Sequence, residues 1–294
     1  MSIAAVVVTY KRPELLKKCI ESIFNQSKAV EKIYLVDNSN EKDAAEVIAQ
    51  FSLEKRNKII YIPLKKNIGG AGGFHVGLKQ AYEDKHDWLW IMDDDTCAEQ
   101  DAVQSIFNVI ETNHFGLKVF ASAVYWQDEE IHSMNYPTVR WQPYDLFNKM
   151  ADQRLIPIRH ASFVSLFIAA ECIKKYGLPM YDYFIWNEDA EYSARILKNE
   201  LGALVLDSKV FHLTATKNSQ IYEAHPDRFF FEIRNKIWMI LFSQAWFWKE
   251  KIKLAGILGD HIIKFLKYNN ANFFKKTLVV FHGMWRGICN RPQK

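Results

Sequence analysis

Three consecutive carboxylates, Asp93, Asp94 and Asp95, close the apolar run from Trp88 to Met92. A short apolar run followed by polar residues is typical of a buried strand that leaves an α/β sheet. Adjacent carboxylates repel one another, so they need solvation, protonation or a cation. In an extended chain Asp93 and Asp95 share one face, whereas Asp94 points to the other. This pair favours a hard divalent cation that keeps positions open for phosphate oxygens, and the alternative is a solvated acidic turn.

Polar side chains also follow the first two apolar runs. Residues 3–8 are followed by Thr9, Tyr10 and Arg12, where hydroxyl and guanidinium groups could hold the base and phosphates of a nucleotide. Asp37 ends the next run and could accept a hydrogen bond from a base N–H or a ribose hydroxyl. The alternatives are an ordinary loop at the first position and a turn or helix cap at Asp37.

A glycine-rich segment, residues 67–74, lies between a predicted strand and a predicted helix. Asn67, Gly69 and Gly70 begin it, and glycine lets a backbone approach a ligand closely while a helix N-terminus favours anions. The segment matches neither the Rossmann fingerprint nor the Walker pattern. We predict a loop that contacts the nucleotide, with a flexible turn as the alternative.

Two further groups could take part in chemistry. Glu188 and Asp189 follow a tryptophan and open a predicted helix, where acidic residues either complement the helix dipole or act as a general base toward an acceptor hydroxyl. His212 follows an apolar strand; it is either structural or a third ligand of a carboxylate-bound cation.

Strands and helices alternate four times in the first third of the chain, and each strand has polar residues at its C-terminal end. This order predicts an α/β fold with a mostly parallel, Rossmann-like sheet and ligand sites at the strand ends. Residues 127–157, which are polar and aromatic, are predicted to form a long connection or lid. The expected strands are 3–8, 32–36, 58–62, 88–92, 119–125, 162–170 and 203–207, and the expected helices include 44–51, 76–82, 101–110 and 189–198.

Charge separates the chain into two parts, and we predict a domain of residues 1–215 followed by a basic, aromatic-rich helical region of residues 216–294. From Arg228 onward there are thirteen Lys and Arg against three acidic residues, while the whole chain has a net charge of +4. Apolar helices with basic flanks and tryptophans suit an anionic membrane surface. A plain helical appendage or an oligomer interface is the alternative, and nucleic acid is disfavoured because no stacking motif is present.

The composition places the chain inside the cell. Its 294 residues, 49% of them hydrophobic, suffice for one large core. The four cysteines show no C-x-x-C spacing, which indicates a reducing compartment and no zinc site. The first residues lack the basic start of a signal peptide, and no apolar stretch reaches the roughly 18 to 20 residues of a spanning helix. We expect a cytoplasmic protein, peripheral at the inner face of the cell membrane.

Taken together, these motifs resemble the inverting family 2 glycosyltransferases, over roughly residues 3–215. The glycine-rich segment and Asn187-Glu-Asp-Ala-Glu-Tyr192 are similar to a bacterial branch of galactofuranosyltransferases and rhamnosyltransferases, whose catalytic segment reads Trp-Asp-Asp-Ala-Asp-Tyr. Here the tryptophan is Trp186, and Asn187 and Glu188 replace the two residues before Asp189. The other matching segments are Val7 to Pro13, Val36-Asp37-Asn38, Met92 to Asp95 and Phe211-His212.

The resemblance implies the nucleotide-sugar transferase fold called GT-A, with a C-terminal helical extension. It implies that Asp93, Asp95 and His212 hold Mn²⁺ or Mg²⁺, which neutralises a diphosphate leaving group. Asp189, with Glu188 beside it, would activate the acceptor hydroxyl for an inverting displacement. The residues implied to contact the nucleotide sugar are Thr9, Tyr10, Arg12, Asp37, Asn67, Gly69, Gly70 and Asp94.

By this resemblance the favoured reaction moves galactofuranose from UDP-galactofuranose to a hydroxyl of a polysaccharide or lipid-linked glycan. Transfer of rhamnose from dTDP-rhamnose is the next choice. A nucleotidyltransferase would want a glycine-rich, basic loop after the first strand, and residues 9–13 contain no glycine. A non-catalytic sugar-nucleotide-binding protein at the membrane stays open, as does a homo-oligomer.

Overall fold

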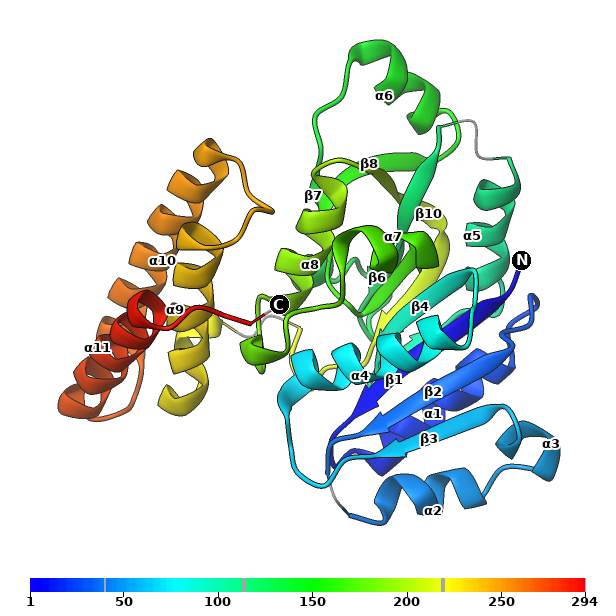
Figure 1. The fold of residues 1–294 in the computed structure, drawn as a ribbon, viewed down its shortest axis with the longest axis horizontal. Helices are drawn as coiled ribbons and strands as arrows, with labels where there is room; N and C mark the ends of the chain where they lie inside the picture. The colour runs from blue at the N-terminus through cyan, green and yellow to red at the C-terminus, as the bar shows by residue number, and fades with distance from the viewer. Residues whose placement is uncertain (40, 113–114, 218–219, 294) are drawn as a thin grey trace.

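The computed structural model describes residues 1–39, 41–112, 115–217 and 220–293, and one mixed sheet lies at its centre (Figure 1). The strand order is β3-β2-β1-β4-β9-β6-β10-β8-β7, with β5 paired to β10. The strands are β1 Ile3–Thr9, β2 Lys32–Asp37, β3 Ile59–Pro63, β4 Trp88–Asp93, β5 Thr96–Ala98, β6 Leu117–Tyr125, β7 Thr138–Val139, β8 Leu155–His160, β9 Ser165–Ala169 and β10 Leu201–His212.

The first half of the sheet is parallel, as predicted. β3, β2, β1 and β4 run side by side in the same direction, and all seven residues of β1 are buried. Thr9 is paired with Asp37 and Val8 with Asp93, so the polar residues that end these strands meet at one edge. The connecting helices are α1 Pro13–Phe24, α2 Asp43–Ala49, α3 Leu53–Arg56 and α4 Gly69–Glu83.

The second half brings His212 to the same edge. β9 is antiparallel to both β4 and β6, and β10 is parallel to β6. β10 is one strand of twelve residues with a register shift between Val205 and Lys209, whereas the sequence predicted a short strand of residues 203–207. The helices of this half are α5 Ala102–Glu111, α7 Ala170–Tyr176 and α8 Glu188–Leu197.

The expected long connection at residues 127–157 is wrong in part. It contains the 3-10 turn η1 Ser133–Asn135, β7 and helix α6 Tyr144–Ala151, and it ends in β8. β8 pairs with β10 through Leu155 to Pro157 and so extends the sheet. These elements are short, and β7 is exposed, so little hydrophobic periodicity marks them in the sequence.

The expected glycine loop is also wrong, because α4 begins at Gly69 and the glycines form its first turns. They let the helix lie directly on β1. A Cβ added at Gly73 would lie 2.6 Å from Cγ1 of Val8, and one at Gly77 would lie 2.5 Å from Cγ1 of Val6. The glycines therefore serve close helix-to-sheet packing as well as access to the cleft.

Three helices, α9 Pro226–Leu241, α10 Trp248–Tyr268 and α11 Phe273–Cys289, form a separate layer beside the sheet (Figure 1). This is the expected C-terminal helical extension. α11 lies close on α9, since a Cβ at Gly283 would lie 2.9 Å from Cβ of Ile233 and one at Gly287 would lie 2.8 Å from Cβ of Ile237. None of the described helices combines the length and the hydropathy needed to cross a membrane.

Candidate active site

A cleft of about 710 Å³ opens at the carboxyl ends of β1, β4 and β10. The starts of α4 and α8 and the first turn of α9 complete its walls. Such an edge is where open α/β sheets bind their ligands. The residues that line the cleft are Val8, Thr9, Tyr10, Arg12, Asn38, Asn67, Gly69, Gly70, Phe74, Asp93, Asp94, Asp95, Phe163, Phe184, Ile185, Trp186, Asn187, Glu188, Asp189, His212, Thr214, Arg228 and Phe231.

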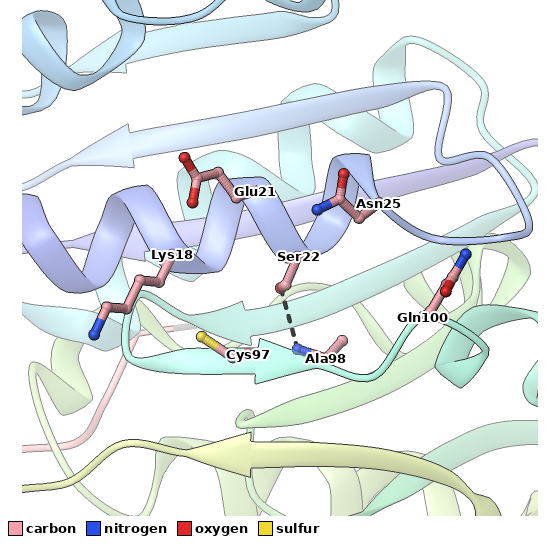
Figure 2. A pocket seen from close by; sticks show the side chains of 7 residues that line it. All are labelled: Lys18, Glu21, Ser22, Asn25, Cys97, Ala98 and Gln100. Atoms are coloured by element: carbon pink, nitrogen blue, oxygen red, sulfur yellow. Dashed lines mark hydrogen bonds between the residues drawn. The ribbon is translucent and has the colours of Figure 1, made fainter.

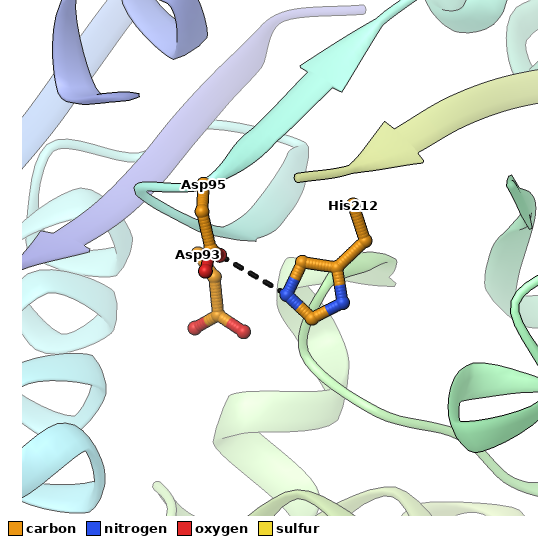
Figure 3. A group of neighbouring side chains, drawn as sticks. All are labelled: Asp93, Asp95 and His212. Carbon is orange, nitrogen blue, oxygen red and sulfur yellow. Dashed lines mark hydrogen bonds and ion pairs between the residues drawn. The ribbon is translucent and has the colours of Figure 1, made fainter. Parts of the chain in front are cut away.

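Asp93, Asp95 and His212 lie together in this cleft (Figure 3). One ligand atom from each lies within 4.8 Å of the others. Nε2 of His212 is 3.0 Å from Oδ1 of Asp95. Burial, with the nearby charge of Asp95, raises the pKa of Asp93 to about 7, and among the described residues its carboxylate has no ion-pair partner. Two carboxylates and an imidazole fit a divalent cation.

The imidazole of His212 is oriented by Asn135. Nδ1 of His212 lies 2.8 Å from Oδ1 of Asn135, and Nδ2 of Asn135 donates to Oγ of Ser162 at 3.2 Å. The amide oxygen therefore accepts the Nδ1–H, which leaves Nε2 on the side of the carboxylates, as a metal ligand requires. Asn135 is not among the site residues predicted from the sequence, because it lies in the segment predicted to be a long connection or lid.

Asp94 turns away from this group, as the alternation predicted. Its carboxylate accepts hydrogen bonds from Oγ1 of Thr9 at 2.7 Å and from the backbone N–H of Tyr10 at 3.3 Å. Arg12 donates to Asp95 at 2.6 Å and lies 3.4 Å from Asp94. Burial raises the pKa of Asp94 to about 6, although Thr9 and Arg12 oppose the shift. Burial would also raise the pKa of Asp95, but His212 and Arg12 hold it below its ordinary value.

Asp189 and Glu188 open α8 at the far wall of the cleft. Burial raises the pKa of Asp189. The backbone N–H of Ala190 opposes this shift, because it donates a hydrogen bond to the carboxylate at 2.6 Å. Burial and the charge of Asp189 raise the pKa of Glu188 well above its usual range. Oε2 of Glu188 is buried, and no hydrogen-bond partner for it is found among the described residues. A carboxylate able to accept a proton thus lies beside a carboxyl group that stays neutral.

The remaining predicted nucleotide contacts fall in two places. Asn67, Gly69 and Gly70 line the cleft, with Oδ1 of Asn67 accepting the backbone N–H of Gly69 at 2.8 Å. Asp37 is 1% exposed and does not line it. The Asp37 carboxylate accepts hydrogen bonds from the hydroxyls of Ser39 and Tyr61, so its predicted contact with a base stays a prediction.

Arg228 and Asn38 also line the cleft, and neither is among the site residues predicted from the sequence. Arg228 lies in the first turns of α9, with its guanidinium 4.8 Å from the centre of a ring of Trp186, and no ion-pair partner is found for it in the described part of the chain. Asn38 donates from Nδ2 to the carbonyl of Gly69 at 2.8 Å and holds the start of α4. The excess of basic residues from Arg228 onward was the sequence signal that could have pointed to Arg228.

A second hollow, of about 590 Å³, lies between α1 and β5 (Figure 2). Oγ of Ser22 accepts the backbone N–H of Ala98 there at 3.1 Å. Burial raises the pKa of Cys97 to about 11, so its thiol stays protonated near neutral pH. The chemistry-bearing groups therefore gather in the first cleft. The second hollow is lined by Lys18, Glu21, Ser22, Asn25, Cys97, Ala98 and Gln100.

Comparison with known proteins decides the family. Residues 4–173 match the family model described as glycosyl transferase family 2. The chain belongs to this family. The expected resemblance is therefore confirmed, and the protein is a glycosyltransferase.

This glycosyltransferase is similar to the galactofuranosyltransferase GlfT1 of Mycobacterium tuberculosis, with 24% identity over 267 residues that cover 83% of this chain and 86% of the mycobacterial protein. An uncharacterized glycosyltransferase of Methanocaldococcus jannaschii, MJ1057, is 32% identical over 129 residues, 43% of each chain.

Among solved structures, residues 1–349 of TarS from S. aureus give a TM-score of 0.63 at 14% identity, covering 98% of this chain and 81% of that one. The same TarS fragment in complex with UDP gives a TM-score of 0.59 at 15% identity, covering 93% and 74%. Likeness at this identity shows the fold, and the expected GT-A fold is confirmed.

Proposed function

We propose that this glycosyltransferase moves galactofuranose from UDP-galactofuranose to a hydroxyl of a polysaccharide or lipid-linked glycan, with a divalent metal and with inversion. The observation that carries the proposal is the grouping of Asp93, Asp95 and His212 in one cleft with Asp189. Similarity to GlfT1 over most of both chains supports the choice of donor.

At the donor side, Asp93, Asp95 and His212 would hold the cation, with Arg12 beside it. When bound, Mn²⁺ or Mg²⁺ stabilises the negative charge of the diphosphate leaving group as a Lewis acid. Arg12 and Arg228 are the guanidinium groups that line the cleft, and guanidinium forks match phosphate oxygens well. Both therefore contact the diphosphate.

At the acceptor side, Asp189 removes the proton of the attacking hydroxyl. Its raised pKa brings the carboxylate closer to the basicity that a general base needs near neutral pH. The hydroxyl oxygen forms the new bond to the anomeric carbon from the face opposite the diphosphate, and the bond to the diphosphate breaks. One displacement of this kind inverts the configuration. Glu188, kept neutral, donates a hydrogen bond to a sugar hydroxyl.

The donor is tested by thermal-shift measurements with UDP-galactofuranose, UDP-galactopyranose and dTDP-rhamnose, each with Mn²⁺ and with EDTA. Specific binding raises the midpoint of unfolding through mass action. We expect the largest shift for UDP-galactofuranose and only with Mn²⁺. A larger shift for dTDP-rhamnose selects the rhamnosyl donor, and equal shifts in EDTA exclude a metal bridge.

Catalysis is tested by release of UDP from that donor in the presence of a glycan acceptor. Asp189→Asn keeps the size of the side chain but cannot take the proton, so we expect turnover to fall by about 10³-fold with donor binding retained. Asp182→Asn, on the same segment but outside the cleft lining, is the matched control. A folded Asp189→Asn variant with full turnover refutes the assignment of the base.

The acceptor is proposed to be presented at an anionic membrane surface, with the enzyme peripheral at its cytoplasmic face. α11 exposes apolar side chains at alternating spacings of four and three residues, which make one continuous face. The exposed charged residues of the helix, Lys275 and Arg286, are both basic and the helix has no acidic residue, so its charge complements anionic lipid and opposes pairing with a second copy. The exposed apolar residues that make this face are Phe274, Leu278, Phe281, Trp285 and Ile288.

Flotation with vesicles of anionic or neutral phospholipid tests this surface. We expect the wild type to float with anionic vesicles, and the double variant Phe281→Glu, Trp285→Glu to lose flotation while it keeps turnover on a soluble acceptor. Flotation that survives this change refutes the membrane proposal.

Separate expression of residues 1–215 tests the proposed domain boundary, which lies between β10 and the turn η3 Ile221–Glu223.

A further inference from the structure

The segment that leads into the catalytic helix has a strained backbone. Phe184, Trp186 and Asn187 have φ angles of 64°, 67° and 69°, in the region that L side chains rarely adopt. Asn187 is the residue before Glu188 and Asp189 and acts as the N-cap of α8. Three such residues in four positions persist only where the surroundings hold them.

Asn235, on α9, supplies part of that hold. Its side chain is fully buried, and Nδ2 lies 2.9 Å from the carbonyl of Tyr183, 2.9 Å from that of Ile185 and 2.8 Å from that of Trp186. Oδ1 accepts hydrogen bonds from the guanidinium of Arg234 at 3.0 and 2.9 Å. Arg234 therefore fixes the orientation of the amide, and both N–H groups of Asn235 face the strained segment.

The same face of α9 holds the side chain of Asn187. Nδ2 of Asn187 donates to Oε2 of Glu232 at 2.8 Å, and Nζ of Lys236 donates to Oδ1 of Asn187 at 3.2 Å. Glu232 is fully buried and also accepts from Lys236 and from Nδ1 of His261 on α10. Glu232, Asn235 and Lys236 are spaced three and four residues apart, so they point the same way.

On its other side the segment rests against the start of α4. The backbone N–H of Ala71 donates to the carbonyl of Phe184 at 3.2 Å. A Cβ added at Gly69 would lie only 2.0 Å from that same oxygen. The segment is thus packed between α4, from the nucleotide-binding half, and α9, from the C-terminal helices.

We infer that Asn235 is a positioning residue of the transfer reaction, because its amide holds the backbone of residues 183–186 so that Asp189 faces the cleft. The inference rests on the proposed role of Asp189 as the base. By this inference the C-terminal helices take part in catalysis. The residues of these helices that contact the segment belong to no recognised motif.

The test replaces Asn235 by Asp, which keeps the volume and the acceptor toward Arg234 but faces the three carbonyls with oxygen. We expect kcat to fall by about 100-fold, the loss that a displacement of about 1 Å causes. Asn235 does not line the cleft, so the Kd of UDP with Mn²⁺, measured by calorimetry, stays within about threefold of the wild type.

Asn269→Asp is the matched control. Nδ2 of Asn269 donates to the carbonyls of Tyr222 at 3.1 Å and Ala224 at 3.0 Å, which is the same kind of contact in the same helical layer but away from α8. We expect it to lower the melting temperature to a similar extent and to leave kcat within about twofold of the wild type. Asp189→Asn, measured in parallel, separates a failure of the base assignment from a failure of the positioning role.

The outcomes are decisive. A folded Asn235→Asp variant with the kcat of the wild type overturns the inference, and so does an equal loss of kcat in both asparagine variants. If Asn235→Asp does not fold, Asn235→Ser, whose hydroxyl can donate to one of the three carbonyls, replaces it with an expected loss of about tenfold. Failure of both Asn235 variants to fold, while Asn269→Asp folds, assigns the residue to folding and also overturns the inference.

Discussion

The ionisation of Asp93 links metal binding to stability. Its ordinary pKa is 3.8, and burial together with the charge of Asp95 raises it to about 7 in the folded protein. A carboxyl whose folded pKa is raised contributes stability below its unfolded pKa and loses that contribution as the pH rises through the folded value. Without metal, the contribution of Asp93 is therefore present below about pH 4 and lost by about pH 7.

The size of the effect follows from the two pKa values of Asp93. The rise from 3.8 to about 7 corresponds to about 4 kcal/mol, and because the Asp93 side chain is only half-buried, solvent screening reduces this to about 2–3 kcal/mol. For a chain of this size that is about 4–12 °C in melting temperature. Asp94 acts in the same direction and Asp95 in the opposite one, so the quantity to measure is the difference between the wild type and Asp93→Asn.

The assay is thermal unfolding followed by circular dichroism from pH 5 to pH 8, in EDTA and in Mn²⁺. In EDTA we expect Asp93→Asn to be more stable than the wild type at pH 8, with the gap closing toward pH 5. Mn²⁺ should stabilise the wild type most at pH 8, because protons compete with the metal for its ligands, and should stabilise the variant much less. A gap that does not depend on pH, or equal stabilisation of both proteins by Mn²⁺, refutes the reasoning.

Three further changes test other parts of the structure. Gly69→Ala should cost at least about 3 kcal/mol or prevent folding, because its φ is +76° and the new Cβ would lie 2.0 Å from the carbonyl oxygen of Phe184. Gly256→Ala, whose new Cβ would have no atom of the described residues within 4 Å, should stabilise α10 by about 0.5–1 kcal/mol when unfolding by denaturant is measured. The pKa of Glu232 is lowered to about 2, because Lys236, His261 and Asn187 outweigh its burial. Its contribution of about 3 kcal/mol to stability is therefore present above about pH 4.5 and lost as the pH falls toward 2. The stability of Glu232→Gln should fall less steeply with decreasing pH than that of the wild type, and equal slopes would contradict the network. Because the pKa of Asp189 is raised, kcat/KM should rise with pH through a value above that of an ordinary aspartate, and a rise centred at or below the ordinary aspartate value would contradict Asp189 as the base.

Much of the fold could be predicted from local patterns. Buried parallel strands such as β1 and β4 are continuous apolar runs that stop at polar residues, so both their positions and their shared edge follow from the sequence. Pro13 marks the start of α1 in the same local way. The metal-ligand set depended on the resemblance, because nothing local to His212 indicates that β10 brings it to Asp95.

The errors have a common physical cause. The glycines of α4 look like a loop because glycine is a poor helix former, and only the presence of Val6 and Val8 beneath them explains the helix. The elements between residues 127 and 157 are stabilised by pairing with β10, far away in sequence. Asn135 and Asn235 make their contacts entirely through the tertiary structure, so no spacing in the chain reveals them.

The ladder between β5 and β10 determines how insertions affect the metal ligands. β5 begins at the residue after Asp95, its Thr96 is paired with His212, and the backbone N–H of Leu213 donates to the carbonyl of Asp95 at 2.8 Å. The spacing of the two ligands is therefore fixed by adjacent backbones and is independent of the length of chain that joins them. Loops between residues 99 and 209 that leave this ladder intact can lengthen, shorten or exchange, and so a new acceptor could be accommodated while the donor half of the enzyme stays unchanged.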